Sequence, residues 1–251
     1  HCMRGDVFQI VLSRRFNQKF CGDEFKLYRA LRSINPSPYL FYFDYGDFKI
    51  FGSSPEAQIV VNDNKAEIHP IAGTFRRTGN DFLDKKKALK LSKDDKENSE
   101  HMMLVDLERN DLGRICLPGS VHWKRWRIES YPHVQHMVSE VEGILNPEKD
   151  GFDALQSVFP GGSITGCPKS ATIAAIDELE TTPRHAWTGS IGHLDPRTGQ
   201  SQLNILIRTL EARFVDNMWE AGLVCGRLCN ATLEVTPFTA VPFSLKYEEI
   251  S

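Results

Sequence analysis

Two acidic side chains in the segment KENSEHMMLVDLERND could hold a metal ion. Glu97 and Glu100 stand three residues apart in a pattern typical of a helix, and Leu104 and Leu107 continue the same stripe, so both carboxylates are expected to face inward. Mg²⁺ is a suitable partner, because it binds few carboxylates and completes its shell with water and substrate oxygens. Salt bridges to nearby lysine and arginine side chains are the alternative explanation.

A glycine-rich segment, PGGSITGCPK (160–169), stands directly before a predicted helix and offers Ser163 among its hydroxyls. The start of such a helix presents unpaired N–H groups to an anion, and Pro168 suits the first helical position. A nucleotide P-loop is excluded, because Cys167 and Pro168 separate Gly166 from Lys169. We therefore expect a small carboxylate as ligand, with a capped turn that binds nothing as the alternative.

Two further residues could act on such a substrate. His136 stands among apolar neighbours, where a hydrogen-bonded core histidine is the alternative to an acid or base. Arg208 interrupts the apolar run NILIRTLEA, and an inward guanidinium normally pairs with a carboxylate of the protein or of a ligand. Together with the acidic pair and the glycine loop, these residues fit a small substrate with two negative charges.

The elements that must position these residues are predicted from periodicity and turn residues. Strands are expected at VFQIVL, at YLFYFDY and FKIFGSS around a Gly46-Asp47 turn, at EAQIVV, KAEIHPI and VHWKRWRIE, and at AWTGSIGHL, SQLNILIRTLEARFV and NMWEAGLV. Helices are expected at Phe25 to Ile34, from Asp81 to about Asp111, at FDALQSVF and at SATIAAIDELE. The order does not alternate strictly, so the pattern predicts an α+β fold with mostly antiparallel sheets.

Composition excludes several classes of protein. The 251 residues are 41% hydrophobic and 25% charged with a formal charge of −3, which argues against whole-chain disorder, collagen or coiled coil and against a general affinity for nucleic acid. No apolar stretch approaches the roughly 20 residues that cross a bilayer. We expect a soluble, cytoplasmic protein with no nucleic acid or membrane partner, whose six cysteines are free thiols.

Eight strings in a fixed order resemble one family: GDVFQIVLSRRF, SPYLFYFDYGDFKIFGSSPEA, HPIAGT, SEHMMLVDLERNDLGRIC, HVQHMVSEVEG, FPGGSITGCPK, WTGSIGHL and NILIRTLEA. They are similar to the chorismate-utilising enzymes, specifically the large subunits (component I) of anthranilate synthase and aminodeoxychorismate synthase, over roughly Gly5 to Gly222. The resemblance implies an α+β fold of two mostly antiparallel β-sheets packed as a sandwich with outer helices. It also implies Mg²⁺, chorismate as substrate, and ammonia from a glutamine amidotransferase partner (component II).

The resemblance also assigns roles by position. It implies a Mg²⁺ ligand at Glu100 and catalytic residues at His136 and Glu97. Substrate-binding residues are implied at Glu56, Gly73, Thr74, Ser163, Trp187 and Arg208.

The product is less clearly indicated, because two sets of strings point different ways. Ala72 stands where many aminodeoxychorismate synthases carry a lysine, which favours anthranilate, whereas VDLERNDLGRIC, FPGGSITG and GSIGHL are more similar to the aminodeoxychorismate branch. We expect anthranilate formation, with aminodeoxychorismate as the main alternative and isochorismate or salicylate chemistry as the remainder. A truncated, non-catalytic protein that binds chorismate or a partner is a further alternative.

Both ends of the sequence depart from the family pattern. The chain begins inside that pattern, so feedback by tryptophan, which the resemblance places in an N-terminal region, is not expected of this chain alone. Residues 1–222 are expected to form the chorismate-binding catalytic domain. Residues 223–251 lack the family's second glycine loop, and Glu234, Glu248 and Glu249 do not have the spacing of its acidic metal-binding segment, which a shifted reading frame would explain.

Overall fold

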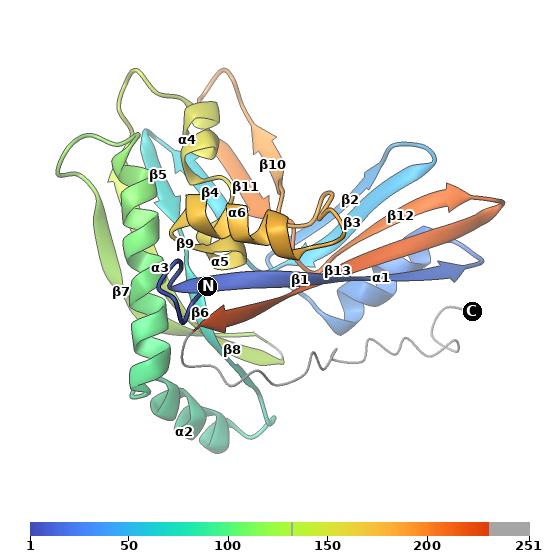
Figure 1. Cartoon of the computed structure of the whole chain (residues 1–251), viewed down its shortest axis with the longest axis horizontal. Helices are drawn as coiled ribbons and strands as arrows, with labels where there is room; N and C mark the ends of the chain where they lie inside the picture. Colours follow the sequence, from blue (N-terminus) through green and yellow to red (C-terminus); the bar gives the residue numbers. More distant parts are fainter. Residues whose placement is uncertain (132, 231–251) are drawn as a thin grey trace. The chain divides into compact units, whose positions relative to one another are not determined.

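The computed structural model describes residues 1–131 and 133–230, which form helices and strands of an α+β fold (Figure 1). The helices are α1 (Glu24–Ile34), α2 (Asp81–Leu91), α3 (Asp95–Gly113), α4 (Gly151–Val158), α5 (Gly162–Thr165) and α6 (Lys169–Leu179). The strands are β1 (Gln9–Phe20), β2 (Tyr39–Asp44), β3 (Phe48–Ser54), β4 (Ala57–Asn62), β5 (Lys65–Ile68), β6 (Ile71–Arg76), β7 (His122–Ser130), β8 (Val134–Ile144), β9 (Gly166–Cys167), β10 (Ser190–Leu194), β11 (Ser201–Ile205), β12 (Thr209–Val215) and β13 (Met218–Asn230). Among the described helices, none combines the length and apolar character needed to cross a membrane.

The chain divides into two compact units that are interleaved in the sequence. Among the described residues, unit 1 comprises His1–Pro55, Ile164–Gly189 and residues 206–230, and unit 2 comprises Glu56–Ser163 and Ser190–Ile205. Strand β13 continues past Gly222, where the expected catalytic domain ends, to Asn230. The assignment of 223–251 to a separate segment stays a prediction, and its carboxylates Glu234, Glu248 and Glu249 lie outside the described residues.

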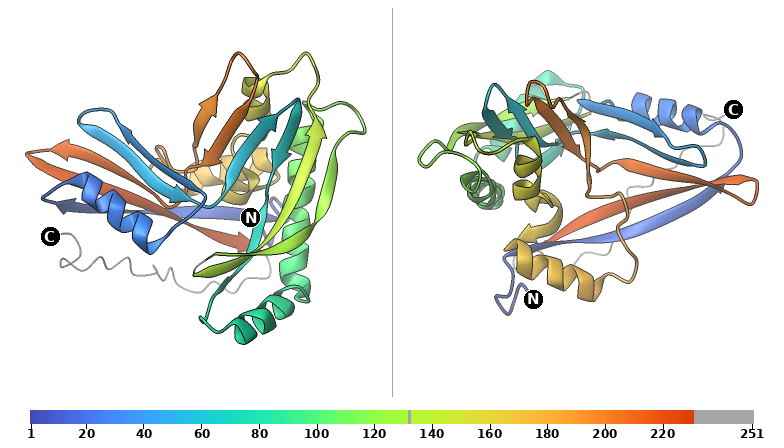
Figure 2. Two further views of the ribbon diagram at one scale, coloured as in Figure 1. Left: turned by 180° about the vertical axis from the view of Figure 1, so that it is seen from behind. Right: turned by 90° about the horizontal axis from the view of Figure 1, so that it is seen from above.

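Unit 1 is built on a six-stranded sheet in the order β2-β3-β12-β13-β1-β9, with every pair antiparallel. Strands β1 and β13 pair from Gln9 opposite Asn230 to Phe20 opposite Trp219, and Figure 2 shows them side by side. Helix α1 begins where Asp23 accepts a hydrogen bond from the Phe25 N–H at 2.8 Å. Its apolar face packs on the sheet, in a core that includes the fully buried Phe51.

Unit 2 is built on a seven-stranded antiparallel sheet in the order β10-β11-β4-β5-β8-β6, with β7 also pairing with β8. Strands β5 and β6 pair with successive parts of β8, from Ile144 back to Val134. Helix α3 packs against β8, β6 and β7, and α4 packs against β4 and α3. The core between helix and sheet includes Val105, Leu112 and Val141.

The described elements confirm the α+β class and most of the predicted segments. The turn at Gly46 joins β2 to β3, and the charged segment from Asp81 forms two helices, α2 and α3. The expected strand SQLNILIRTLEARFV is instead two strands, β11 and β12, because the chain breaks between them at Arg208, whose φ is 50°. The described cysteines are free thiols, as expected.

Candidate active site

Helix α3 presents the two predicted carboxylates in its first two turns. Asp94 caps the helix, accepting hydrogen bonds from the N–H groups of Lys96 at 3.1 Å and Glu97 at 3.2 Å. Glu97 and Glu100 are both half-buried, and Lys96 Nζ lies 3.8 Å from Glu100 Oε1. Such a partly exposed ion pair is weak, so it leaves the carboxylates available to a stronger cation.

The buried face of α3 lies beside the face that was predicted from the spacing of Glu97, Glu100, Leu104 and Leu107. Its buried residues are His101, Leu104, Val105, Glu108, Asp111 and Leu112. Glu97, Glu100 and Leu107 therefore flank the core and do not point into it. The flank position suits a metal ligand, since carboxylates at the core's edge can still reach water and substrate.

The surroundings of Glu97 disfavour its negative charge. Burial raises the pKa of the Glu97 carboxyl, and the neighbouring charges of Glu100 and Asp94 raise it further. A divalent cation would relieve this repulsion, and the donors are hard oxygens of the kind that Mg²⁺ prefers. The residues present therefore fit a Mg²⁺ ion held by Glu100 with Glu97 beside it.

Gly73 on β6 lies directly against Glu97. Its φ is +66°, and a Cβ placed there would lie 3.1 Å from Glu97 Oε2 and 2.8 Å from Leu91 Cδ1. The register of β6 against β8 shifts at this point, between Ala72 and Thr74. Glycine is thus required both by the left-handed backbone and by the close approach of the helix.

His136 and Thr74, predicted separately, are brought together on neighbouring strands. Thr74 is opposite His136 in the β6–β8 pairing, and Thr74 Oγ1 shares a hydrogen bond with His136 Nδ1 at 2.9 Å. His136 is 2% exposed, and the Tyr131 ring lies 5.8 Å from its own, centre to centre. This bond fixes the orientation of the imidazole, which a catalytic histidine needs.

A second buried histidine, which sequence reasoning missed, joins α3 to β8. His101 Nε2 lies 2.5 Å from Ser139 Oγ, and both residues are fully buried. Burial lowers the pKa of His101 to about 4, so the ring is neutral near pH 7. The signal that could have found it is its spacing, because His101 precedes Leu104 and Val105 by one helical turn.

The glycine loop contains a short helix and a short strand before α6 begins. Residues 162–165 form the short α5, β9 pairs with β1, and α6 then starts with Pro168 as its N-cap and not as its first helical residue. Gly166 is needed because a Cβ there would lie 2.2 Å from the Gln9 carbonyl oxygen. A Cβ at Gly162 would lie 2.1 Å from Leu107 Cδ2. Both glycines allow close packing, and the binding of a carboxylate by this loop stays a prediction.

Ser163 and Glu56 are both placed within unit 2. Ser163, Glu108 and Asp111 are among the residues that line a small cavity, and sequence reasoning did not identify the two carboxylates. The Ser163 Oγ is buried without a hydrogen-bond partner among the described residues. Glu56 is 6% exposed, and its carbonyl accepts a hydrogen bond from the Ile205 N–H at 3.1 Å.

Trp187 and Arg208 belong to unit 1. Trp187 is 5% exposed and packs with Val11 and Val224, while the Arg184 guanidinium lies 4.9 Å from the centre of its ring. Arg208 Nη1 donates to Asn35 Oδ1 at 3.1 Å. The carboxylate partner that the sequence predicts for Arg208 stays a prediction. Their roles in binding substrate stay predictions.

The backbone around these two residues is strained. His185, Thr188 and Arg208 have φ values of 52°, 68° and 50°, although none is glycine, and Thr188 is β-branched. The two segments are tied together, because the Thr188 N–H donates to the Leu206 carbonyl and the Leu206 N–H to the Gly189 carbonyl. Such strain persists where the surroundings enforce it, which is common at functional sites.

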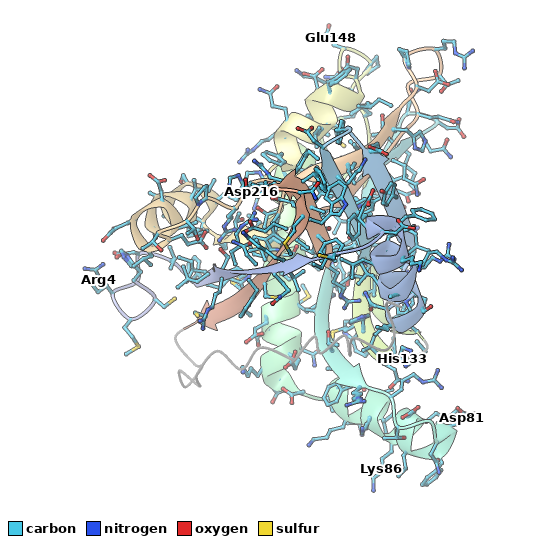
Figure 3. The ribbon with its side chains drawn as sticks, turned by 90° about the vertical axis from the view of Figure 1, so that its right-hand side faces the viewer. Arg4, Asp81, Lys86, His133, Glu148 and Asp216 are labelled. Carbon is cyan, nitrogen blue, oxygen red and sulfur yellow. The ribbon has the colours of Figure 1, made fainter. Side chains whose placement is uncertain are left out.

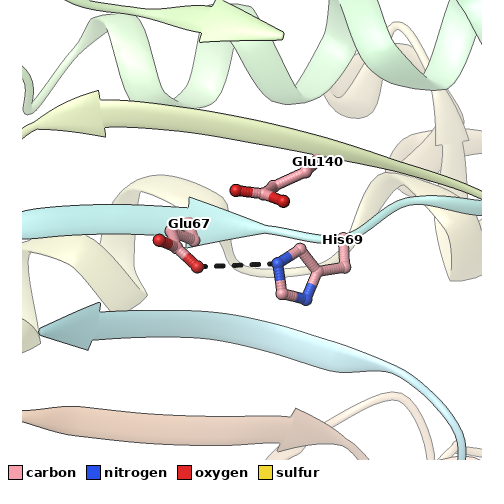
Figure 4. Close-up of side chains that lie close together, drawn as sticks. All are labelled: Glu67, His69 and Glu140. Atoms are coloured by element: carbon pink, nitrogen blue, oxygen red, sulfur yellow. Dashed lines mark ion pairs between the residues drawn. The ribbon is translucent and has the colours of Figure 1, made fainter. Parts of the chain in front are cut away.

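Another group of metal-ligating side chains lies on the sheet of unit 2 (Figure 4). Glu67, His69 and Glu140 each place a ligand atom within 4.8 Å of the other two, and none is fully buried. Both carboxylates already have cationic partners, since Lys65 Nζ lies 2.8 Å from Glu67 and Lys124 Nζ lies 2.6 Å from Glu140. An ion-pair network therefore accounts for the group, which does not include the predicted ligand Glu100.

Comparisons with known proteins show the family to which this chain belongs. The family model described as chorismate binding enzyme matches residues 1–225. Anthranilate synthase component 1 of Spirochaeta aurantia is 50% identical over 193 residues, covering 76% of this chain and 40% of that protein. Aminodeoxychorismate synthase component 1 of Bacillus subtilis is 46% identical over 209 residues, covering 83% of this chain and 44% of that protein.

Solved structures show the same fold. Anthranilate synthase component I from Streptococcus pneumoniae superposes with a TM-score of 0.83 at 38% identity, covering 93% of this chain and 51% of that one. The menaquinone-specific isochorismate synthase MenF from Escherichia coli gives 0.84 at 22% identity. This chain thus spans about half the length of these relatives, and across that span it is a member of the chorismate binding enzyme family.

Proposed function

We propose that this chain carries chemistry of the anthranilate synthase component 1 type, in which ammonia converts chorismate to anthranilate. Ammonia adds at ring carbon C2 while the C4 hydroxyl leaves as water, and loss of pyruvate then gives the aromatic product. The observation that carries the proposal is the identity of 42–50% to several proteins named anthranilate synthase component 1, over 193–220 residues. Ala72 in the PIAGT string also favours this product over aminodeoxychorismate.

The residues of unit 2 would handle the protons of this reaction. His136 is held through Nδ1 by Thr74, so Nε2 is the nitrogen through which its ring would assist the departing hydroxyl or take the later C2 proton. Glu97, whose pKa burial raises, is the partly buried carboxyl beside the proposed metal ligand. Gly73 keeps the backbone of β6 close to that carboxylate.

Glu100 would hold Mg²⁺, with Glu97 next to it. The ion, when bound, would neutralise the ring carboxylate of chorismate and stabilise the charge that develops there. In unit 1 the Arg208 guanidinium would pair with the enolpyruvyl carboxylate, and Trp187 would supply an aromatic surface. A glutamine amidotransferase, the component 2 that the relatives' names imply, would deliver ammonia.

Formation of aminodeoxychorismate is the second candidate. It is favoured by the Bacillus subtilis aminodeoxychorismate synthase component 1, whose 46% identity to this chain falls within the range of the anthranilate synthases. That reaction places the amino group at C4 and retains the enolpyruvyl group. The two candidates therefore differ in product mass and fluorescence, and only the first releases pyruvate.

The test incubates the purified chain with chorismate, Mg²⁺ and excess ammonium salt and identifies products by mass and fluorescence. We expect anthranilate and pyruvate in equal amounts, and a loss of about 10²–10⁴-fold in rate for His136→Gln, the range ascribed to a general acid or base. His133→Gln is the matched control, because this neighbouring histidine is exposed (Figure 3). An unchanged chorismate pool would count against catalysis by this chain, and aminodeoxychorismate would favour the second candidate.

A further inference from the structure

The hydrogen bond between His101 and Ser139 lies between the parts of unit 2 that carry the proposed chemistry. His101 follows Glu100 on α3, and Ser139 stands three residues after His136 on β8. Successive strand residues face opposite sides, so Ser139 faces the helix while His136 faces away from it. The bond therefore connects the helix that bears both carboxylates to the strand that bears the histidine.

Ser139 is bonded on two sides. Its hydroxyl meets His101 Nε2 at 2.5 Å, and its N–H donates to the Pro70 carbonyl at 3.2 Å. Pro70 immediately precedes β6, the strand of Gly73 and Thr74. The fully buried Ser139 thus contacts both α3, which carries Glu97 and Glu100, and the residue that leads into β6.

The first two turns of α3 contain no fully buried side chain before His101. Residues 95–100 are exposed or half-buried, and His101 is the first buried residue of the helix. The polar pair has a cost, because His101 Nδ1 is buried and has no hydrogen-bond partner among the described residues. A leucine in place of His101, facing an alanine in place of Ser139, would avoid this cost. A hydrogen bond is directional, so it fixes the rotation of α3 about its own axis and its position along β8, which a leucine contact would not do.

We infer that His101 and Ser139 are positioning residues, which set the place of Glu97 and Glu100 relative to β6 and β8 and thereby the affinity for Mg²⁺. The inference rests on the proposed Mg²⁺ site of the proposed function. Partners behind metal ligands commonly change metal affinity by 10–100-fold when they are removed.

The experiment compares Ser139→Ala with Ser157→Ala as a matched control. Ser157 on α4 also donates its hydroxyl to α3, at the Asp111 carbonyl at 2.5 Å, but near the other end of the helix. Mg²⁺ is titrated by calorimetry in the presence of chorismate, and amide hydrogen exchange is measured without either. His101→Gln, which keeps a polar group within reach of Ser139, is the conservative variant.

We expect Ser139→Ala to raise the dissociation constant for Mg²⁺ about tenfold and to speed exchange of the amides of residues 98–101. His101→Gln should retain most of the affinity for Mg²⁺. Ser157→Ala should leave both the affinity and the exchange rates unchanged. Equal exchange of these amides in the two alanine variants would overturn the inference. If the unaltered chain binds no Mg²⁺ but Ser139→Ala still loosens the first turns of α3, the metal site of the proposed function fails and the positioning role stands.

Discussion

At the scale of single residues, Glu97 carries a charge in surroundings that disfavour it. Its pKa is raised in the folded chain, so the protonated carboxyl contributes stability at low pH, and this contribution is lost as the pH rises through the raised pKa. Glu97→Gln removes the repulsion. At pH 7.5 without Mg²⁺ we expect the variant to melt about 1–2 °C higher, equivalent to roughly 0.5 kcal/mol after solvent screening.

The sign of this effect is checked by thermal unfolding at two pH values. At pH 4, slightly below the ordinary glutamic acid pKa of about 4.3, the difference between variant and parent should become much smaller. Glu148→Gln is the control, because Glu148 is an exposed carboxylate of the same unit (Figure 3). A Glu97→Gln protein that melts lower than its parent at pH 7.5 would show that the charged carboxylate is stabilised.

The sequence predicts which residue types meet better than it predicts their exact partners. Thr74 and His136 are 62 residues apart, and their hydrogen bond follows from the pairing of β6 with β8, which periodicity does not reveal. The sequence did not predict the role of His101, because the stripe that contains Glu97 and Glu100 lies on the flank of α3 and His101 lies on its buried face. The hydrogen bond from Arg208 to Asn35, 173 residues earlier in the chain, likewise depends on tertiary packing.

At the scale of elements, the contact of β6 with α3 depends on Gly73. Alanine there would have to adopt a left-handed backbone and would press on Leu91 and Glu97. We expect Gly73→Ala to lower the free energy of unfolding by about 2–5 kcal/mol, since left-handed strain costs about 1–2 kcal/mol and overpacking about 1–3 kcal/mol. Urea denaturation measures the loss.

Gly79→Ala separates the two causes. Gly79 also has a left-handed φ, +80°, but a Cβ there would meet no atom within 4 Å. This control should therefore lose only the backbone contribution, about 1–2 kcal/mol. Equal losses for the two variants would mean that neither Leu91 of α2 nor Glu97 of α3 presses on β6 at Gly73.

Elements with clear periodicity and turn residues were predictable, and elements made by distant pairing were not. The alternation in YLFYFDY and FKIFGSS around Gly46 is local, and β2 and β3 form as expected. Strand β9 contains two residues and exists because Gly166 permits contact with β1, more than 150 positions earlier in the chain. No local pattern carries that information.

At the scale of the whole molecule, the division into two interleaved units was not foreseen. The chain passes between them at Pro55–Glu56, Ser163–Ile164, Gly189–Ser190 and Ile205–Leu206. Composition does not change at these points, and no linker marks them. Glu56, Ser163, Trp187 and Arg208 each stand at or close to one of these four positions in the sequence.

Because β1 pairs with β13, which is far along the chain, this pairing is delayed during synthesis on the ribosome. Strand β1 ends at Phe20 and β13 begins at Met218, so at about 5–20 residues per second the first strand waits roughly 10–40 s for its partner. Nascent chains stalled before β13 has emerged should therefore be cut by protease within β1, and chains released after Asn230 should resist. Protection of β1 in the shorter chains would mean that a different partner shelters it. Until that moment most of β1 lacks its partner strand, so we expect holdase chaperones to bind the nascent protein during translation.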